Sequence, residues 1–344
     1  MLRSIISQIS QGAQLRPTIA KLCPRFSFST AATTTEEAGK SDSKADETPQ
    51  KETKFINVDK DGPITIIAIN RPEHRNAINA AAASQLCEAI DAFESDETAS
   101  VGVLVGVGGS FCSGYEINEL GGENINTDIL MQAEGSVGPT RRHLKKPIIC
   151  AINGYCVANG LELALLCDLR VMEESAILGF FNRRIGVPVI DGGTARLPAM
   201  IGISRAMDLI LTGRRVTAKE AFDFGIANRI VATGTACGQA MNLAQSIAKF
   251  PQAALNHDRK SLLGAVYDSP NFDTAVQNEV MYTSKEIMEE MKDGIAKFIA
   301  GAYRGGKSAN DCKENSMADW EKNEISREKR KLGNCKKDRD SKKK

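Results

Sequence analysis

The sequence predicts an α/β fold for the central part of the chain. Short, partly β-branched apolar runs recur at residues 62–70, 101–107 and 148–152. Patterns of helical periodicity lie between and after them, and Gly, Pro or Asn residues separate the two kinds of segment. This alternation of strands and helices is typical of an α/β core. With 344 residues, 42% of them hydrophobic, the chain can bury one sizeable core.

The first predicted elements precede residue 121. In order, they are a strand at 62–70, a helix from Asn79 to about Phe93, a strand at 101–107, and a loop at 109–120 that runs into a helix. Asn79 stands where a side-chain oxygen can cap the first helical turn. Leu86, Ile90 and Phe93 fall on one face of the helix, which is therefore expected to lie against the core.

The later predicted elements follow the same logic. In order, they are a strand at 148–152, a helix that contains Glu162, a strand at 169–171, and helices at 204–213, 217–224, 237–250 and 276–302. Thr217 precedes Glu220 by three residues, which is the spacing of a capping box at a helix N-terminus.

Residues 146–168, KPIICAINGYCVANGLELALLCD, are the most informative segment. A strand-length apolar run leads into a turn at Asn153-Gly154, then into a small-residue stretch at 158–160, and Glu162 falls in the first turn of the following helix. The N-terminus of a helix presents unpaired backbone N–H groups and can hold developing negative charge. A carboxylate beside it can act as an acid or base on a bound carbonyl compound.

This segment resembles the hallmark of the crotonase (enoyl-CoA hydratase/isomerase) family. Four further blocks agree with the family in order and spacing: NRPEHRNAIN (70–79), GSFCSGYEINEL (109–120), IGVPVIDGGTARLP (185–198) and ILTGRRVTAKEAFDFGIANRIV (210–231). The resemblance covers residues 55–306 and implies a spiral of ββα units with a helical C-terminal region used for trimerisation. It places a crotonase domain at 54–306, with the spiral core at about 54–230 and the helical region at 231–306.

The resemblance also implies a chemistry. The family polarises the thioester carbonyl of an acyl-CoA with two backbone N–H groups, and the matching positions are Tyr115 and Asn159. Glu162 matches the first of the two catalytic glutamates of the hydratases. From local spacing alone, a glutamate favoured by the helix dipole is the simpler interpretation of Glu162.

Two positions depart from the family pattern in ways that affect the chemistry. Asn182 stands where the hydratases carry their second glutamate, and an amide neither delivers nor accepts a proton at neutral pH. Asp191 is the candidate for a second acid group. The alternative is that Asp191 caps or turns the Gly192-Gly193 bend.

The remaining site positions implied by the resemblance bind the CoA and acyl parts of the substrate. They are Arg75, Ala77, Ser113, Gly114 and Gly160. A basic residue near the CoA phosphates has a clear electrostatic reason. The expected ligand is a coenzyme A thioester as substrate, with no permanently bound cofactor and no metal, because the nine cysteines and three histidines show no metal-ligand spacing.

The leading functional prediction is an enoyl-CoA hydratase of fatty-acid or branched-chain acyl-CoA metabolism. An enoyl-CoA isomerase or an acyl-CoA decarboxylase on the same scaffold is the alternative. A non-catalytic homologue that binds acyl-CoA or RNA is an alternative of another class. The formal net charge of +1 argues against nucleic acid as the main partner, and no apolar run is long enough to span a bilayer.

Both ends of the chain differ in composition from its centre. Residues 1–35 contain four basic residues and no acidic one, which is typical of a mitochondrial transit peptide and predicts a location in the mitochondrial matrix. Residues 36–53 are polar and predict a disordered linker. Residues 307–344 hold thirteen Lys or Arg against eight Asp or Glu, which predicts a basic, disordered tail and leaves RNA binding open. The resemblance implies a homotrimer or homohexamer.

Overall fold

The computed structural model describes residues 54–120 and 132–300. The predicted transit peptide, linker and basic tail therefore lie outside the described residues. The chain divides into two compact units, residues 1–280 and residues 281–344. The described part of the second unit contains the helix α12 (Lys285–Ile299).

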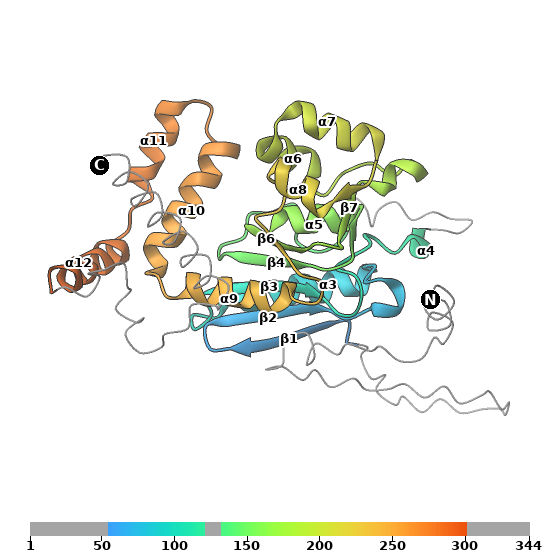
Figure 1. Cartoon of the computed structure of the whole chain (residues 1–344). Helices are drawn as coiled ribbons and strands as arrows, with labels where there is room; N and C mark the ends of the chain where they lie inside the picture. The colour runs from blue at the N-terminus through green and yellow to red at the C-terminus, as the bar shows by residue number, and fades with distance from the viewer. Residues whose placement is uncertain (1–53, 121–131, 301–344) are drawn as a thin grey trace, which may run out of the picture. The chain divides into compact units, whose positions relative to one another are not determined.

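A six-stranded sheet forms the centre of the first unit (Figure 1). Its order is β1 (Ile56–Asp61), β2 (Ile64–Ile69), β3 (Val101–Gly106), β4 (Ile148–Ile152), β6 (Leu169–Glu173) and β9 (Arg229–Val231). β1 is antiparallel to β2, and all the other neighbours are parallel. Every residue of β2, β3 and β4 is buried, as expected of parallel strands that are covered on both faces.

The two faces of this sheet carry separate hydrophobic clusters. Ile67, Leu104 and Ile152 belong to the cluster that includes the buried face of α3 (Ala80–Ser95). Ile66, Val103 and Val171 belong to the cluster formed with α9 (Ala236–Ala248). Alternate residues of one strand point to opposite faces, so each strand contributes to both layers.

A smaller three-stranded sheet carries the loops of the candidate site. Its order is β5 (Tyr155–Val157), β7 (Ile177–Gly179) and β8 (Val216–Thr217), with β5 and β7 parallel and β7 and β8 antiparallel. The helices α4 (Ile117–Leu120), α5 (Asn159–Leu166), α6 (Gly193–Ile201), α7 (Ile203–Thr212), α8 (Ala218–Phe224), α10 (Gln252–Tyr267) and α11 (Phe272–Met281), with 3-10 turns at Pro72–His74 and Phe181–Ile185, complete the fold.

The predicted α/β class, with a helical C-terminal region, is confirmed. Asn79 caps α3 by accepting a hydrogen bond from the N–H of Ala82, and Thr217 caps α8 by accepting from the N–H of Glu220. The single helix predicted at 276–302 is wrong, because α11 ends at Met281 and α12 begins at Lys285. Ser284 caps the new helix, since its hydroxyl accepts from the N–H of Ile287.

Seven further elements of the described residues were not predicted: β1, β5, β7, β8, β9, α6 and α10. In the part of the chain that the structure describes, no helix is both long enough and apolar enough to cross a bilayer.

Candidate active site

The loop after β3 runs beside β5, and this pairing assembles the candidate site. The N–H of Cys112 donates to the carbonyl of Tyr155 at 3.1 Å, and the N–H of Val157 donates to the carbonyl of Cys112 at 3.0 Å. Residues that follow Cys112 therefore lie next to residues that follow Val157. The approach is close, because a Cβ placed on Gly114 would lie 3.1 Å from the backbone nitrogen of Asn159.

The two predicted oxyanion donors, Tyr115 and Asn159, lie on these adjoining segments. Asn159 is the first residue of α5, preceded by Ala158 with the unusual backbone angles φ 53° and ψ −131°. Within residues 54–120 and 132–300, the backbone N–H groups of Tyr115 and Asn159 donate to no protein acceptor. Both N–H groups are therefore free to bind a ligand oxygen.

The side chain of Tyr115 is bound to Glu119 of α4, which also contacts the start of α3. Its hydroxyl donates to Oε2 of Glu119 at 2.7 Å, and the same oxygen accepts from the N–H of Ala80 at 3.0 Å. Burial, followed by the contact with Glu119, raises the pKa of the Tyr115 phenol well above its ordinary value. The phenol therefore stays neutral and acts as an anchor for the loop.

Glu162 lies in the first turn of α5 and is fully buried. Its Oε1 accepts from the N–H of Asp191 at 2.7 Å and from the N–H of Gly193 at 3.0 Å. Burial and the nearby Asp191 raise the pKa of Glu162 to about 7, although the two backbone donors act in the opposite direction. Near neutral pH the carboxyl group is thus present in both forms, which suits an acid or a base.

Asp191 is fully buried beside Glu162. Its Oδ1 accepts from the N–H of Ser136 and from the hydroxyl of Thr140, both at 2.9 Å, and its Oδ2 accepts from the hydroxyl of Ser136. Nε of Arg141 lies 3.8 Å from Oδ1. The side-chain partners of Asp191 thus come from the loop at 132–147 and from α5, and none lies in the Gly192-Gly193 bend.

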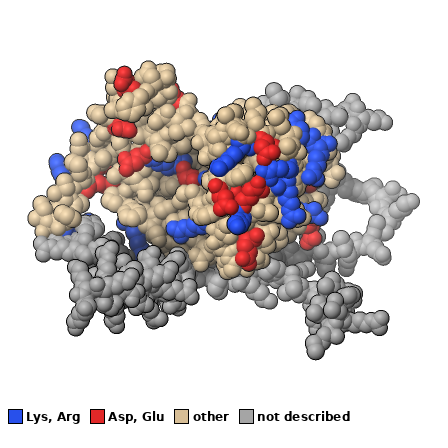
Figure 2. Space-filling view, turned by 45° about the horizontal axis from the view of Figure 1, so that its top comes forward, with Lys and Arg blue, Asp and Glu red and all other residues tan. Residues whose placement is uncertain are grey.

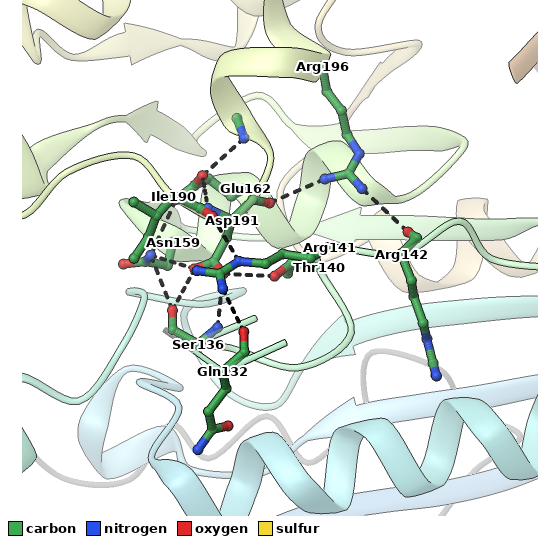
Figure 3. A network of polar contacts seen from close by, with 11 residues as sticks. Gln132, Ser136, Thr140, Arg141, Arg142, Asn159, Glu162, Ile190, Asp191 and Arg196 are labelled. Atoms are coloured by element: carbon green, nitrogen blue, oxygen red, sulfur yellow. Dashed lines mark hydrogen bonds and ion pairs between the residues drawn. The ribbon is translucent and has the colours of Figure 1, made fainter. Parts of the chain in front are cut away.

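The side chain of Asn159 connects the two carboxyl groups (Figure 3). Its Nδ2 lies 2.7 Å from Oδ2 of Asp191, 3.2 Å from Oε2 of Glu162 and 3.3 Å from the hydroxyl oxygen of Ser136. The residue therefore contributes a side chain as well as a backbone N–H to the site.

Asn182 is buried in the 3-10 turn at Phe181–Ile185. Its Nδ2 donates to the carbonyl of Val187 at 3.0 Å, and its Oδ1 has no hydrogen-bond partner within the described residues. A carboxylate has no donor for the Val187 carbonyl, so the local structure suits the amide.

The residues predicted to bind CoA lie around the same loop. The N–H of Ser113 donates to the carbonyl of Arg75 at 3.1 Å, and the N–H of Ile78 donates to the carbonyl of Gly114 at 2.8 Å. These bonds bring the segment with Arg75 and Ala77 against Ser113 and Gly114. The exposed Arg75 guanidinium lies 5.6 Å from the ring centre of Tyr155.

Gly160, also predicted to bind substrate, is required by close packing. A Cβ there would lie 2.5 Å from the carbonyl oxygen of Cys112, so only glycine allows α5 to start this near the loop.

Several residues that contact Asp191 were not predicted from the sequence. Ser136, Thr140 and Arg141 lie in an irregular loop without a recognisable motif. The role of the Asn159 side chain was also missed, because the family match concerns only its backbone. In the part of the chain that the structure describes, no group of three His, Cys, Asp or Glu residues is arranged to hold a metal ion.

A family model described as enoyl-CoA hydratase/isomerase matches residues 59–301. The chain belongs to the enoyl-CoA hydratase/isomerase family. A probable enoyl-CoA hydratase of Rhizobium meliloti is 32% identical over 247 residues, which are 71% of this chain and 94% of the relative. The 2,3-dehydroadipyl-CoA hydratase of Escherichia coli is 29% identical over 236 residues, covering 69% of this chain and 92% of the relative.

Solved structures agree with this membership. The crystal structure of an enoyl-CoA hydratase from Mycobacterium tuberculosis has a TM-score of 0.65 and 33% identity. The match covers 72% of this chain and 96% of the hydratase chain. A second hydratase structure, from Geobacillus kaustophilus, has a TM-score of 0.66 and 33% identity over 73% of this chain and 97% of its own. The fold is thus the crotonase fold, with two sheets and a C-terminal helical region.

Proposed function

We propose that the protein is an enoyl-CoA hydratase whose acid/base group is Glu162. The observation that supports this most is a buried carboxyl group with a pKa of about 7, on a helix whose first N–H has no acceptor among the described residues. A group that titrates near the working pH can both take and return a proton. The relatives named as hydratases point in the same direction.

In the proposed reaction, the thioester oxygen of an enoyl-CoA accepts hydrogen bonds from the N–H groups of Tyr115 and Asn159. Ionised Glu162 takes a proton from water, and the water oxygen bonds to C3 while the C2–C3 π electrons move towards the thioester. The two N–H groups stabilise the resulting enolate oxygen. The proton on Glu162 then passes to C2, which restores the carboxylate and leaves a 3-hydroxyacyl-CoA.

In the proposed reaction, Asp191 supports Glu162 and does not contact the substrate. Its negative charge raises the pKa of Glu162, and its backbone N–H binds Glu162 directly. We further propose that Arg75, Ala77, Ser113, Gly114 and Gly160 bind the CoA and acyl parts of the substrate, and that no cofactor is permanently bound.

Isomerisation of an enoyl-CoA is the second candidate, and Asn182 is the observation that favours it. Because Asn182 is an amide, Glu162 is the one carboxyl group at the two positions of the family's catalytic glutamates. One carboxyl group is sufficient to move a proton from C2 to C4 of a 3-enoyl thioester, whereas the hydratases of the family use two.

Location and assembly are also proposals. A matrix location is supported by the acid-free composition of residues 1–35 and by a 29% identical relative from Dictyostelium discoideum named as a probable mitochondrial enoyl-CoA hydratase. Assembly as a homotrimer or homohexamer is supported by the exposed apolar side chains of α10 and α11, which are Leu262, Val266, Phe272, Val276, Val280 and Met281.

RNA binding has less support than acyl-CoA chemistry. On the face drawn in Figure 2, Lys and Arg side chains gather towards one side, and acidic side chains lie beside and between them. Arg214, for example, is paired with Asp208 at 2.7 Å and with Glu220 at 2.6 Å. Electrostatic binding of a phosphate backbone needs unpaired positive charge gathered on one face.

The test is a product assay with two substrates. Purified protein is incubated with crotonyl-CoA in ¹⁸O-water, and the product is analysed by mass spectrometry. A hydratase gives 3-hydroxybutyryl-CoA that carries the label. In a parallel assay, 3-hexenoyl-CoA is converted to the conjugated isomer only by an isomerase. Turnover in the second assay alone would replace hydration by isomerisation.

A further inference from the structure

We propose that Asn159 is a positioning residue whose side-chain amide holds Glu162 and Asp191 together as one unit with the oxyanion site. The proposal rests on the function proposed above, because it concerns the same acid/base group. It adds a role for a side chain at a position where the family match concerns only the main chain.

The geometry of one residue carries the proposal. The backbone N–H of Asn159 has no protein acceptor within the described residues, while its Nδ2 lies within hydrogen-bond distance of both carboxyl groups. The residue is 2% exposed, so its amide has no access to bulk water as a replacement partner. Any movement of its backbone towards a bound oxyanion therefore acts on the Glu162 carboxyl group through a single side chain.

Without the amide, Oε2 of Glu162 loses the hydrogen bond that fixes it. Oε1 is held by two backbone N–H groups, whereas Oε2 lies within hydrogen-bond distance of Nδ2 of Asn159. This second bond sets the rotation of the carboxyl group about its last side-chain bond. It thus decides which lone pair of Glu162 faces the reacting atoms.

Charge balance explains why an amide is suited to this place. Among the described residues, the charged groups around Glu162 are Asp191 and the guanidinium groups of Arg141 and Arg196. Arg196 donates to the carbonyl of Asp191 at 3.2 Å, and Arg141 approaches its carboxylate. Two buried carboxyl groups this close repel each other when both are ionised. A neutral donor that bonds to both stabilises their charged forms without adding a further charge.

The test follows protonation of Glu162 in the ligand-free protein. Infrared difference spectra between wild type and Glu162→Gln give the C=O band of the protonated Glu162 carboxyl group, whose intensity is measured against pH. In Asn159→Gly the midpoint pH of this titration should rise, because the ionised Glu162 carboxylate loses a hydrogen-bond donor. If hydration is observed, kcat should fall about 10- to 100-fold with little change in KM, the effect of one lost hydrogen bond to a charged group.

The matched control is Asn242→Gly. Asn242 is exposed on α9, so this variant makes the same substitution with a helix penalty but leaves the site intact. It should not move the midpoint. If Asn159→Gly does not fold, Asn159→Ser retains a short donor and should give a midpoint between those of wild type and complete loss of the bond.

An unchanged midpoint in both Asn159 variants, or an equal shift in Asn242→Gly, would overturn the proposal. The titration uses no substrate, so its result is independent of the hydratase assignment. A shifted midpoint without any hydration by wild type would leave the role of Asn159 standing and remove the proposed function.

Discussion

At the scale of single residues, the site depends on where buried charge is placed. Glu162 and Asp191 are both fully buried, and most of their hydrogen-bond donors come from the backbone and from neutral side chains. Such donors are fixed before a substrate arrives, which is the condition for electrostatic catalysis. A buried carboxyl group with a raised pKa also makes the free energy of unfolding depend on pH.

The first prediction concerns stability and pH. The pKa of Glu162 in the folded protein, about 7, lies above the ordinary glutamate value of 4.5, so the native state binds more protons than the unfolded state between these values. The stability that this contributes is fully present below about pH 4.5 and is lost as the pH rises through about 7. From pH 4.5 to 8, wild type should lose about 3 kcal/mol of unfolding free energy relative to Glu162→Gln.

Urea denaturation of both proteins across this range measures the difference. A difference that stays constant with pH would mean that Glu162 titrates normally in the folded protein, and the proposed acid/base role would lose its physical basis.

The second prediction tests the oxyanion site through Gly114. This residue has φ +100°, and a Cβ there would lie 3.1 Å from both the Asn159 nitrogen and the Ala158 Cβ. Gly114→Ala should therefore obstruct the Asn159 N–H and lower kcat about 100-fold or more, the typical loss of one oxyanion donor. Gly62→Ala is the control for backbone strain alone, because Gly62 has φ +57° and open space around it. Equal activity of the two variants would argue against the oxyanion assignment.

The family blocks alone were sufficient to predict Glu162 and the N–H groups of Tyr115 and Asn159 as site positions. Their roles in the reaction stay predictions. Ser136 and Thr140 could not, because they reach Asp191 across 55 and 51 residues of chain from a loop without periodicity. The contacts of the Asn159 side chain could not be predicted from the sequence either, since its partners are set by tertiary packing.

At the scale of elements, α5 (Asn159–Leu166) links the site to the core. Glu162 lies in its first turn, and its C-terminal end is covered by Arg170, which is 4% exposed. The guanidinium donates to the carbonyl of Cys167 at 2.6 Å and, from Nε, to the carbonyl of Ile226 at 2.6 Å. Burial lowers the pKa of Arg170, but its donors satisfy carbonyls that the end of a helix leaves unpaired.

The third prediction follows from this cap. Arg170→Met fills a similar space but leaves several buried carbonyls without a donor, so the unfolding free energy should fall by about 3 kcal/mol. Thermal or urea denaturation measures the loss, and the folded fraction should keep its activity. Arg214→Met is the contrasting variant, because its ion pairs lie at the surface and should be worth less than about 1 kcal/mol. Similar losses in the two variants would contradict the role given to Arg170.

Element prediction from sequence worked where a strand is wholly apolar or a helix has a clear cap. β2, β3 and β4 are buried along their whole length, and Thr217 marks the start of α8. β5 has only three residues, too few to show a period of two. The break between α11 and α12 was missed because amphipathic periodicity continues through the Ser284 cap.

At the scale of the whole molecule, family membership and exposed apolar surface both bear on the oligomeric state of the protein. α10 and α11 expose more large apolar side chains than a solvated helix needs, and the family resemblance associates this region with trimerisation. We therefore predict that light scattering coupled to size exclusion will give three or six times the chain mass of 37.1 kDa. A monomer mass over the micromolar range would contradict this.

The role of Glu162 as the acid/base group is tested by the hydration rate of crotonyl-CoA, followed at the absorbance of the conjugated thioester, in wild type and Glu162→Gln side by side. Wild type should consume the substrate, and the variant should be slower by about 100-fold or more, the usual contribution of a general acid or base. Equal rates in the two proteins, or no consumption by a wild type that still binds acyl-CoA, would contradict the claim that Glu162 is the acid/base group of a hydratase.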